Sequence, residues 1–495
     1  MSDKIKTKYN WVKVSEMYDE TPNLNSNYAK NCTHKGYEGL WCKLIKAVTS
    51  YGMTNDCVAV IHGPTNCAWA VRNFCSTNYS LYYGNSFLHM PTTALNNSSI
   101  VNGAEKELID TLIEVDKTYK PQHIAVFDTC STSLIGDNIQ NCINEAQLKC
   151  AAKINFIEGA GFSSPPLGQS IQETAVKYGE IMEKPVHIIP KSVNILGQYK
   201  EGHCNKKKKK RGKYPDDAQE LVRYIEALGL NIHRVLISGD YEYIKTAPEA
   251  LVNVISCPTW GLPLAKTMKD MFDTPYLPHS VPTGIESTCR WIRDLAYFTD
   301  TVDEAEILIN KELELLNLIF EKAKTLVNGK TALIECGRNS MTAFARPMAL
   351  ARFLQELGMK PYLFGLHPFE LKAKGIDLDY FLWDGFNPMI LSDPYHYQNP
   401  TNIANVIKDL ELKEEDYVYF SQDVFPMAKS GEFDPSSNAK VEVSVHLRRV
   451  FNSPGRGVGF KGAEALCQNI IESVLMASRK TKPTLYGRVH GEFYD

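Results

Sequence analysis

Cys32, Cys67 and Cys130 are predicted to lie in small-residue loops at or near strand ends, and Cys257 ends a later predicted strand. These four side chains are the ones in this chain best suited to redox or metal chemistry. Three of them come soon after short apolar runs that are typical of buried strands. Thiolates are soft ligands, and several of them converging at strand ends favour iron–sulfur chemistry. Because the spacing matches no simple motif such as Cys-x-x-Cys, the prediction depends on where the fold places these thiols.

The other nine cysteines are predicted to be small buried core residues, the commonest role of an isolated cysteine: Cys42, Cys57, Cys75, Cys142, Cys150, Cys204, Cys289, Cys336 and Cys467. The 13 cysteines are scattered and odd in number, in a chain of 495 residues. This usage indicates free thiols and ligands in a reducing compartment rather than a disulfide framework.

Composition and charge exclude several other classes of protein. The net charge of −3 gives no electrostatic case for binding nucleic acid or an anionic membrane. The polar N-terminus has no apolar core of a secretory signal, and no apolar run is long enough to span a bilayer. We therefore expect a cytoplasmic protein.

Short β-branched runs alternate with amphipathic helical patterns along nearly the whole chain. The predicted strands are Val58–His62, His123–Asp128, Ile154–Glu158, Val193–Leu196, Arg234–Ser238, Leu251–Ser256, Thr331–Glu335, Pro361–Phe364 and Tyr417–Phe420. The clearest helical patterns are Ala104–Val115, Gln219–Leu228, Thr301–Val327 and Ala463–Ala477. This alternation predicts an α/β fold of parallel, doubly wound sheets, which bind ligands at the carboxyl ends of their strands.

Short landmark segments run along most of the chain, from about Cys32 to about Ser478: Gly36–Gly39, His62–Cys67, Ile100–Leu108, Cys130–Asp137, Ser192–Gly197, Leu228–Ile232, Ser238–Asp240 and Val252–Cys257. In order and spacing they resemble component 1 of nitrogenase and its relatives. The resemblance is closest to the α-type subunits and to the related scaffold subunit of cofactor assembly.

The resemblance implies metal groups and partners. Cys32, Cys67 and Cys130 match the thiols that an α-type subunit gives to a P-cluster-type iron–sulfur cluster shared with a β-type subunit. Cys257 matches the single thiol that anchors a large iron–sulfur cofactor, similar to the FeMo-cofactor or its precursor. The partners would be a β-type subunit, in an α2β2 heterotetramer, and an ATP-hydrolysing iron protein as electron donor. The chain has no phosphate-binding Gly-x-x-x-x-Gly-Lys-Ser/Thr loop of its own.

The same resemblance implies three Rossmann-like lobes around a cofactor cavity. We expect an N-terminal extension over residues 1–30, a first lobe with the three cluster cysteines over 31–190, a second lobe with Cys257 over 191–325, and a third lobe with the C-terminal tail over 326–495. The lysine-rich segment 201–217 is predicted to be a solvated surface loop, and a docking patch for an acidic partner is the alternative.

The sequence departs from the dinitrogen-reducing members near the cofactor. Pro165 falls where those enzymes have a Gln, and Gln169 falls where they have a His, so a hydrogen-bond donor and a proton shuttle are lost. Val458 occupies the place of the second cofactor ligand, a His. His446 is the alternative ligand after a shift of the alignment, and Arg456 could face an anionic cofactor or solvent.

Two arginines complete the candidate site. Arg72 resembles an arginine that lies over the cofactor in the family, and Arg338 stands at another predicted strand end. With Gln169 they are the candidate catalytic residues, and surface salt bridges are the alternative role for both arginines.

Three functions are compatible with these features. The first is a catalytic α-type subunit that reduces a small substrate other than dinitrogen, for example by cleaving a carbon–sulfur bond; Cys257 argues against a tetrapyrrole reductase, because those relatives lack the anchoring cysteine. The second is a non-catalytic scaffold for cofactor assembly, since loss of the His ligand would ease release. The third is a divergent dinitrogenase α chain.

Overall fold

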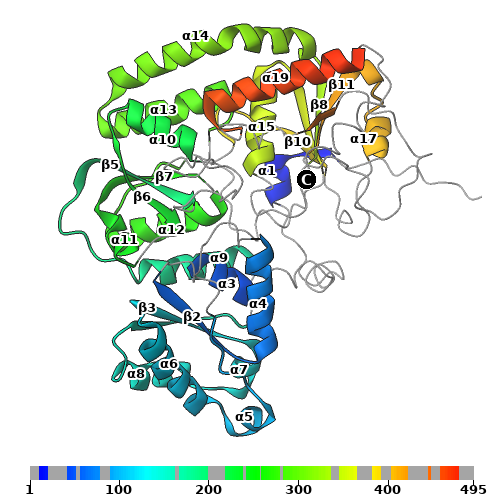
Figure 1. The fold of residues 1–495 in the computed structure, drawn as a ribbon. Helices are drawn as coiled ribbons and strands as arrows, with labels where there is room; N and C mark the ends of the chain where they lie inside the picture. Colours follow the sequence, from blue (N-terminus) through cyan, green and yellow to red (C-terminus); the bar gives the residue numbers. More distant parts are fainter. Residues whose placement is uncertain are drawn as a thin grey trace, which may run out of the picture.

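In the computed structural model of this chain, the described residues form three β-sheets covered by helices (Figure 1). The structure describes residues 11–19, 42–51, 56–78, 90–161, 167–198, 218–237, 241–256, 258–278, 282–335, 345–364, 382–391, 403–421, 444–446 and 457–478. Within these ranges every strand pair is parallel except one at a sheet edge. The predicted α/β class with parallel sheets is confirmed.

The first sheet has the strand order β2-β3-β4. Its elements are β2 (Cys57–His62), β3 (His123–Asp128), β4 (Lys153–Ile157), α3 (Lys43–Tyr51), α4 (Thr65–Asn78), α5 (Asn97–Asn102), α6 (Glu105–Tyr119), α7 (Cys130–Ile135) and α8 (Ile139–Gln147). Successive side chains of β2 enter two cores, because strand side chains alternate between faces. Val58 and Val60 pack with α6 and α8, whereas Ala59 and Ile61 pack with α3 and α4.

The second sheet has β5 at its centre, between β6 and β7. Its elements are β5 (Ile189–Gln198), β6 (Asn231–Ile237), β7 (Ala250–Ile255), α9 (Leu167–Gly179), α10 (Gln219–Ala227), α11 (Tyr241–Lys245), a 3-10 turn η2 (Ala247–Glu249) and α12 (Pro258–Phe272). Helices α9 and α12 approach closely at Gly179, where an added Cβ would lie 2.7 Å from a methyl group of Thr267. Tyr178 and Met268 belong to the same core as Ile61 of β2, so the first two sheets share one hydrophobic core.

The third sheet has the strand order β1-β10-β9-β8-β11-β12. Its elements are β1 (Trp11–Lys13), α1 (Val14–Asp19), β8 (Thr331–Glu335), α15 (Ala345–Glu356), β9 (Lys360–Phe364), β10 (Met389–Leu391), α17 (Ile403–Asp409), a 3-10 turn η3 (Glu414–Asp416), β11 (Tyr417–Ser421) and β12 (Ser444–His446). Strand β1 comes from the expected N-terminal extension and pairs antiparallel with β10. All nine predicted strands are present, and the three additional strands β1, β10 and β12 have only three residues each, too few to show a periodic pattern.

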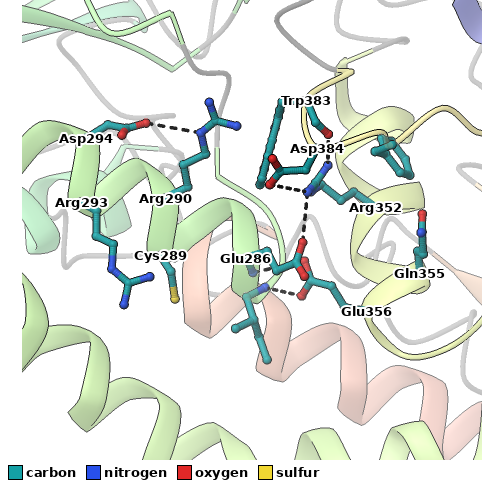
Figure 2. Close-up of a pocket in the computed structure, with 12 residues that line it drawn as sticks. Glu286, Cys289, Arg290, Arg293, Asp294, Arg352, Gln355, Glu356, Trp383 and Asp384 are labelled. Carbon is teal, nitrogen blue, oxygen red and sulfur yellow. Dashed lines mark hydrogen bonds and ion pairs between the residues drawn. The ribbon is translucent and has the colours of Figure 1, made fainter.

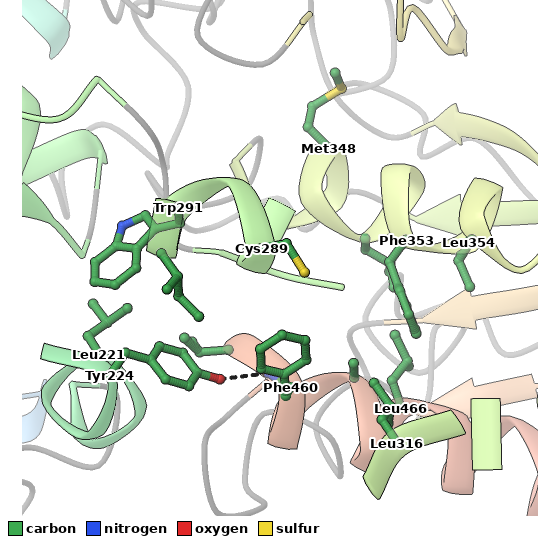
Figure 3. Close-up of a cluster of buried hydrophobic side chains, with 14 of the residues drawn as sticks. Leu221, Tyr224, Cys289, Trp291, Leu316, Met348, Phe353, Leu354, Phe460 and Leu466 are labelled. Carbon is green, nitrogen blue, oxygen red and sulfur yellow. Dashed lines mark hydrogen bonds between the residues drawn. The ribbon is translucent and has the colours of Figure 1, made fainter. Parts of the chain in front are cut away.

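Three long helices join the second and third sheets: α13 (Ile285–Thr299), α14 (Val302–Val327) and α19 (Gly459–Ser478). Figure 3 shows the core beneath them, where Trp291 of α13, Tyr224 of α10, Phe353 of α15 and Phe460 of α19 are fully buried. The backbone N–H of Phe460 donates to the Tyr224 hydroxyl at 2.8 Å, so the start of α19 is fixed to α10. Among the described helices, none is long and apolar enough to cross a membrane.

Candidate metal centre

Three cysteines from different elements converge at the carboxyl end of the first sheet, and we call them the thiol site: Cys42, Cys67 and Cys130. Cys42 directly precedes α3, Cys67 lies in the first turn of α4, and Cys130 begins α7. A Cβ atom added to Gly161 would lie 3.6 Å from Cys130 Sγ and 3.8 Å from Cys42 Cβ, so the side chains of both cysteines lie next to Gly161. Cys67 is close enough for the charges of both other thiolates to raise its pKa.

Pairing of β2 with β3 brings two of these thiols together. The two strands are in register up to their last residues, His62 beside Asp128, so the segments that follow them begin side by side. The prediction that Cys67 and Cys130 lie in loops was wrong, because both lie in the first turn of a helix. That position suits a thiolate, since the helix dipole and free backbone N–H groups favour negative charge there.

The electrostatics of the thiol site favour the binding of metal cations. Burial raises the pKa of Cys67, and the neighbouring Cys42 and Cys130 raise it further. Three thiolates in one place repel one another, and iron ions would remove that penalty. The backbone N–H of Gly161 donates to Cys130 Sγ at 3.2 Å, the kind of hydrogen bond that stabilises sulfur charge in iron–sulfur proteins. The residues present therefore fit a thiolate-bound cluster.

The Asp128 carboxylate fixes the segment that ends at Gly161. Asp128 Oδ1 accepts hydrogen bonds from the backbone N–H groups of Gly159 and Ala160, directly before Gly161. Burial raises the pKa of Asp128, while these bonds lower it again. The segment after β4 is thereby fixed against the end of β3, with the Gly161 amide directed at Cys130.

A buried lysine stands beside Cys42. The Lys43 side chain is only 3% exposed, and its Nζ lies 2.8 Å from Glu158 Oε2 and 3.1 Å from Glu173 Oε2. Burial lowers the pKa of Lys43, but the two carboxylates more than offset this and leave it raised. The ammonium group therefore connects α3, the end of β4 and α9 around the thiol site.

The structure describes only some of the predicted site residues. Arg72 is exposed on α4. Gln169 lies in α9 and His446 in β12, and their side chains are not among those described. Val458 is 5% exposed and belongs to the core between the second and third sheets, so its position offers no ligand atom. The others fall outside the described residues: Cys32, Pro165, Cys257, Arg338 and Arg456.

Cys42 is the member of the thiol site that sequence reasoning missed. We predicted it to be a core cysteine, and this was wrong, since it is only half-buried and adjoins two other thiols. The prediction of a buried core residue is confirmed for five other cysteines: Cys57, Cys142, Cys150, Cys289 and Cys467. Across the described ranges, no three His, Cys, Asp or Glu side chains are close enough together to hold a single metal ion, so the thiol site fits only a cluster in which the thiolates bind different iron atoms.

Away from the thiol site, a pocket lies between α13, α15 and the segment 382–386 (Figure 2). It has a volume of about 650 Å³. The Trp383 ring lies between two guanidinium groups, with Arg352 3.2 Å and Arg290 4.2 Å from its centroid. Arg352 Nη1 donates to the Trp383 carbonyl at 3.0 Å, and Arg352 Nη2 donates to Glu286 at 3.1 Å. These contacts join α13 to α15 and are structural.

Glu356 is the unusual acid of this pocket. Its two carboxylate oxygens accept hydrogen bonds from the backbone N–H groups of Ile285 at 2.8 Å and Glu286 at 3.2 Å, which caps the start of α13. Burial raises the pKa of Glu356 to about 8, although these two bonds act in the opposite direction. The acid is therefore largely protonated at neutral pH.

Three α/β units with mostly parallel sheets, and three thiols at the carboxyl end of the first sheet, define a multi-lobed α/β protein. The family model for nitrogenase component 1 type oxidoreductases matches residues 42–382, more than half of the chain, and the chain belongs to this family. The match begins at Cys42 and does not include Cys32.

Individual relatives are distant. The chain is similar to the nitrogenase iron-molybdenum cofactor biosynthesis protein NifE of Methanococcus maripaludis, with 27% identity over 299 residues that cover 58% of each chain. It is 26% identical over 322 residues to the nitrogenase molybdenum-iron protein alpha chain of Methanosarcina barkeri, covering 63% of this chain and 56% of the relative. The chain thus spans less than two thirds of the length of either relative.

A solved structure shows the shared fold. Nitrogenase Cp1 at pH 5 matches with a TM-score of 0.60 and 18% identity, covering 89% of this chain and 90% of that one.

Proposed function

We propose that this chain is the α-type subunit of a nitrogenase-like, two-component oxidoreductase and that its thiol site holds an iron–sulfur cluster shared with a β-type subunit. The convergence of Cys42, Cys67 and Cys130 carries this proposal. Cys42 replaces Cys32 as the third ligand in the proposal, because it borders the other two thiols and begins the family match. Such a cluster would relay single electrons.

An apolar face beside the thiol site supports a partner subunit. Trp69 of α4 is 65% exposed, Leu134 of α7 is 75% exposed and Val101 of α5 is 80% exposed. Trp69 and Leu134 are two and four residues from their cluster cysteines, and α5 packs against α7. Large exposed apolar side chains of this kind are typical of protein interfaces. A β-type subunit bound here would enclose the cluster and complete its ligands in an α2β2 assembly.

The remaining roles follow the family. Electrons would come from an ATP-hydrolysing iron protein, and Cys257, which follows β7 by two positions in the sequence, would anchor a large iron–sulfur cofactor. Arg72, Gln169 and Arg338 would bind or orient the substrate, and His446 and Arg456 would contact the cofactor. With Pro165 and Gln169 in place of a Gln and a His, we propose a small substrate other than dinitrogen, such as a thioether whose carbon–sulfur bond is cleaved.

A second function, a scaffold for cofactor assembly, is favoured by Val458. Its side chain is packed in a hydrophobic core and cannot provide the second cofactor ligand. An anchor through Cys257 alone would hold a cofactor precursor less tightly and allow its release. The similarity to NifE of Methanococcus maripaludis points in the same direction.

The test is iron and acid-labile sulfide analysis of the anaerobically co-purified complex, with electron paramagnetic resonance of the reduced state. Cys42→Ala should remove the interface cluster, whereas Cys57→Ala, a buried cysteine of β2, should retain it. Unchanged iron in Cys42→Ala would refute the proposed ligand set, and Cys32→Ala then tests the alternative ligand.

A second measurement separates catalyst from scaffold. Turnover of a thioether by the complex and an iron protein, without any acceptor, would support the enzyme. Transfer of iron–sulfur cofactor to an added apo-acceptor, with no turnover, would support the scaffold. An iron content that accounts for the interface cluster alone, and that is unchanged in Cys257→Ala, would refute cofactor binding and with it both the enzyme and the scaffold function.

A further inference from the structure

A buried histidine lies directly behind the thiol site. His62 ends β2, five residues before Cys67, and its side chain is fully buried. Its Nδ1 lies 3.1 Å from Thr93 Oγ1, and its Nε2 lies 3.1 Å from Asp137 Oδ2. Asp137 follows α7, the helix that begins with Cys130. The imidazole therefore connects the segments that carry two of the three thiols.

The hydrogen bonds define which nitrogen of the His62 ring carries the proton. Thr93 Oγ1 accepts the backbone N–H of Gly63 at 3.0 Å, which leaves its own proton free to donate to His62 Nδ1. His62 Nε2–H then donates to the Asp137 carboxylate, whose other oxygen accepts the backbone N–H of Ala104 at 3.1 Å. Burial lowers the pKa of His62 more than Asp137 raises it, in agreement with a neutral ring.

The main chain of the same residue makes a second connection. The His62 carbonyl oxygen accepts hydrogen bonds from Thr129 Oγ1 at 3.1 Å and from Thr132 Oγ1 at 3.0 Å. Thr129 precedes Cys130, and Thr132 lies in the same turn of α7. At Gly63 the two segments are in such close contact that an added Cβ would lie 2.3 Å from a methyl group of Thr129. Side chain and backbone of His62 therefore hold the two thiol-bearing segments together.

We propose that His62 is a positioning residue, which fixes Cys67 relative to Cys130 before any cluster binds. What these thiols hold rests on the proposed function, but their relative placement is a property of the chain alone. Preorganised ligands bind more tightly because the cost of ordering them is not incurred on binding. Outer-shell hydrogen bonds of this kind orient metal ligands and tune the metal.

The chain offers a matched control at the opposite end of the same sheet. His123 begins β3 and is as fully buried as His62, and burial lowers its pKa to about 3. It pairs with Cys57 at the start of β2, whereas His62 pairs with Asp128 at the other end of the same two strands, and the ring centroid of His123 lies 5.7 Å from that of Tyr241. His62→Leu and His123→Leu therefore remove equally buried imidazoles, only one of which lies behind the thiol site.

The first test uses the metal-free protein and hydrogen exchange. In His62→Leu we expect the backbone amides of residues 62–67, other than Pro64, and of 129–132 to exchange about tenfold faster or more, as for lost hydrogen bonds to a charged group. His123→Leu should leave these two segments at the wild-type rate. Unchanged exchange in His62→Leu, or equal acceleration in both variants, would overturn the proposal.

The second test follows the reconstituted protein. His62→Leu should release iron to a chelator faster than His123→Leu at equal thermal stability and should change the paramagnetic resonance spectrum. His62→Gln keeps a hydrogen-bond donor for Asp137 and should restore part of the difference. If His62→Leu does not fold, both tests are made with His62→Gln and Asp137→Asn. Wild-type rates of amide exchange and of iron release in these two variants would overturn the proposal. A wild-type protein without iron at the thiol site would refute the proposed function, while the exchange result would still decide the role of His62.

Discussion

Replacing Glu356 by Gln should remove a pH dependence of stability that the fold creates. In the unfolded chain this carboxyl group has its ordinary pKa of 4.5, whereas burial raises the pKa to about 8 in the folded protein. At a pH between these two pKa values, the folded state binds about one proton more than the unfolded state. The free energy of unfolding therefore falls as pH rises through this window, by about 1.4 kcal/mol per pH unit.

The magnitude over the whole window is at most about 5 kcal/mol, reached only if the site does not relax around the charge. Gln resembles the protonated acid, since it keeps one oxygen to accept a backbone N–H from the start of α13 and does not titrate. We expect wild type and Glu356→Gln to have similar stability near pH 5. At pH 8 the variant should be more stable by several kcal/mol.

The assay is guanidinium unfolding under reducing, anaerobic conditions at pH 5, 6, 7 and 8, followed by tryptophan fluorescence. Glu306→Gln is the control, because Arg293 lowers the pKa of Glu306 and its contribution has the opposite sign. The control should keep the wild-type loss of stability between pH 5 and 8. A wild-type slope in Glu356→Gln, or lower stability than wild type at pH 8, would refute the reasoning.

Three further substitutions test the site and the core. Cys42→Ala should lower the iron content by the whole interface cluster, while Cys57→Ala leaves it unchanged; equal iron in the two variants would contradict the ligand assignment. Lys43→Met should destabilise the protein by about 1–3 kcal/mol in urea unfolding, because its two carboxylate partners lose a buried counterion but can still reach solvent; a more stable variant would show that the ammonium costs more to bury than its ion pairs return. Trp291→Ala should cost about 3–5 kcal/mol by the same assay, since the ring is fully buried in the core between the second and third sheets, and a loss under 1 kcal/mol would show that this core is loosely packed.

Local patterns were sufficient for most of the elements. The buried strands such as His123–Asp128 are runs of apolar residues on both faces, and this composition requires a sheet covered by helices on each side. The helix Val302–Val327 shows a clear apolar stripe over seven turns. Strands of three residues such as β10 carry no such pattern, because their pairing depends on neighbours that are far away in the sequence.

The sequence by itself determined that thiols follow buried strands, and so indicated Cys67 and Cys130. Only the tertiary structure decided that Cys42 joins them. This cysteine follows no strand, and it approaches the other two because α3 packs across the first sheet and against α9. The packing of α3 depends on side chains of α3, of the first sheet and of α9, which are separate segments of the sequence. The periodicity of a single segment shows which of its faces is buried, but not what packs against that face.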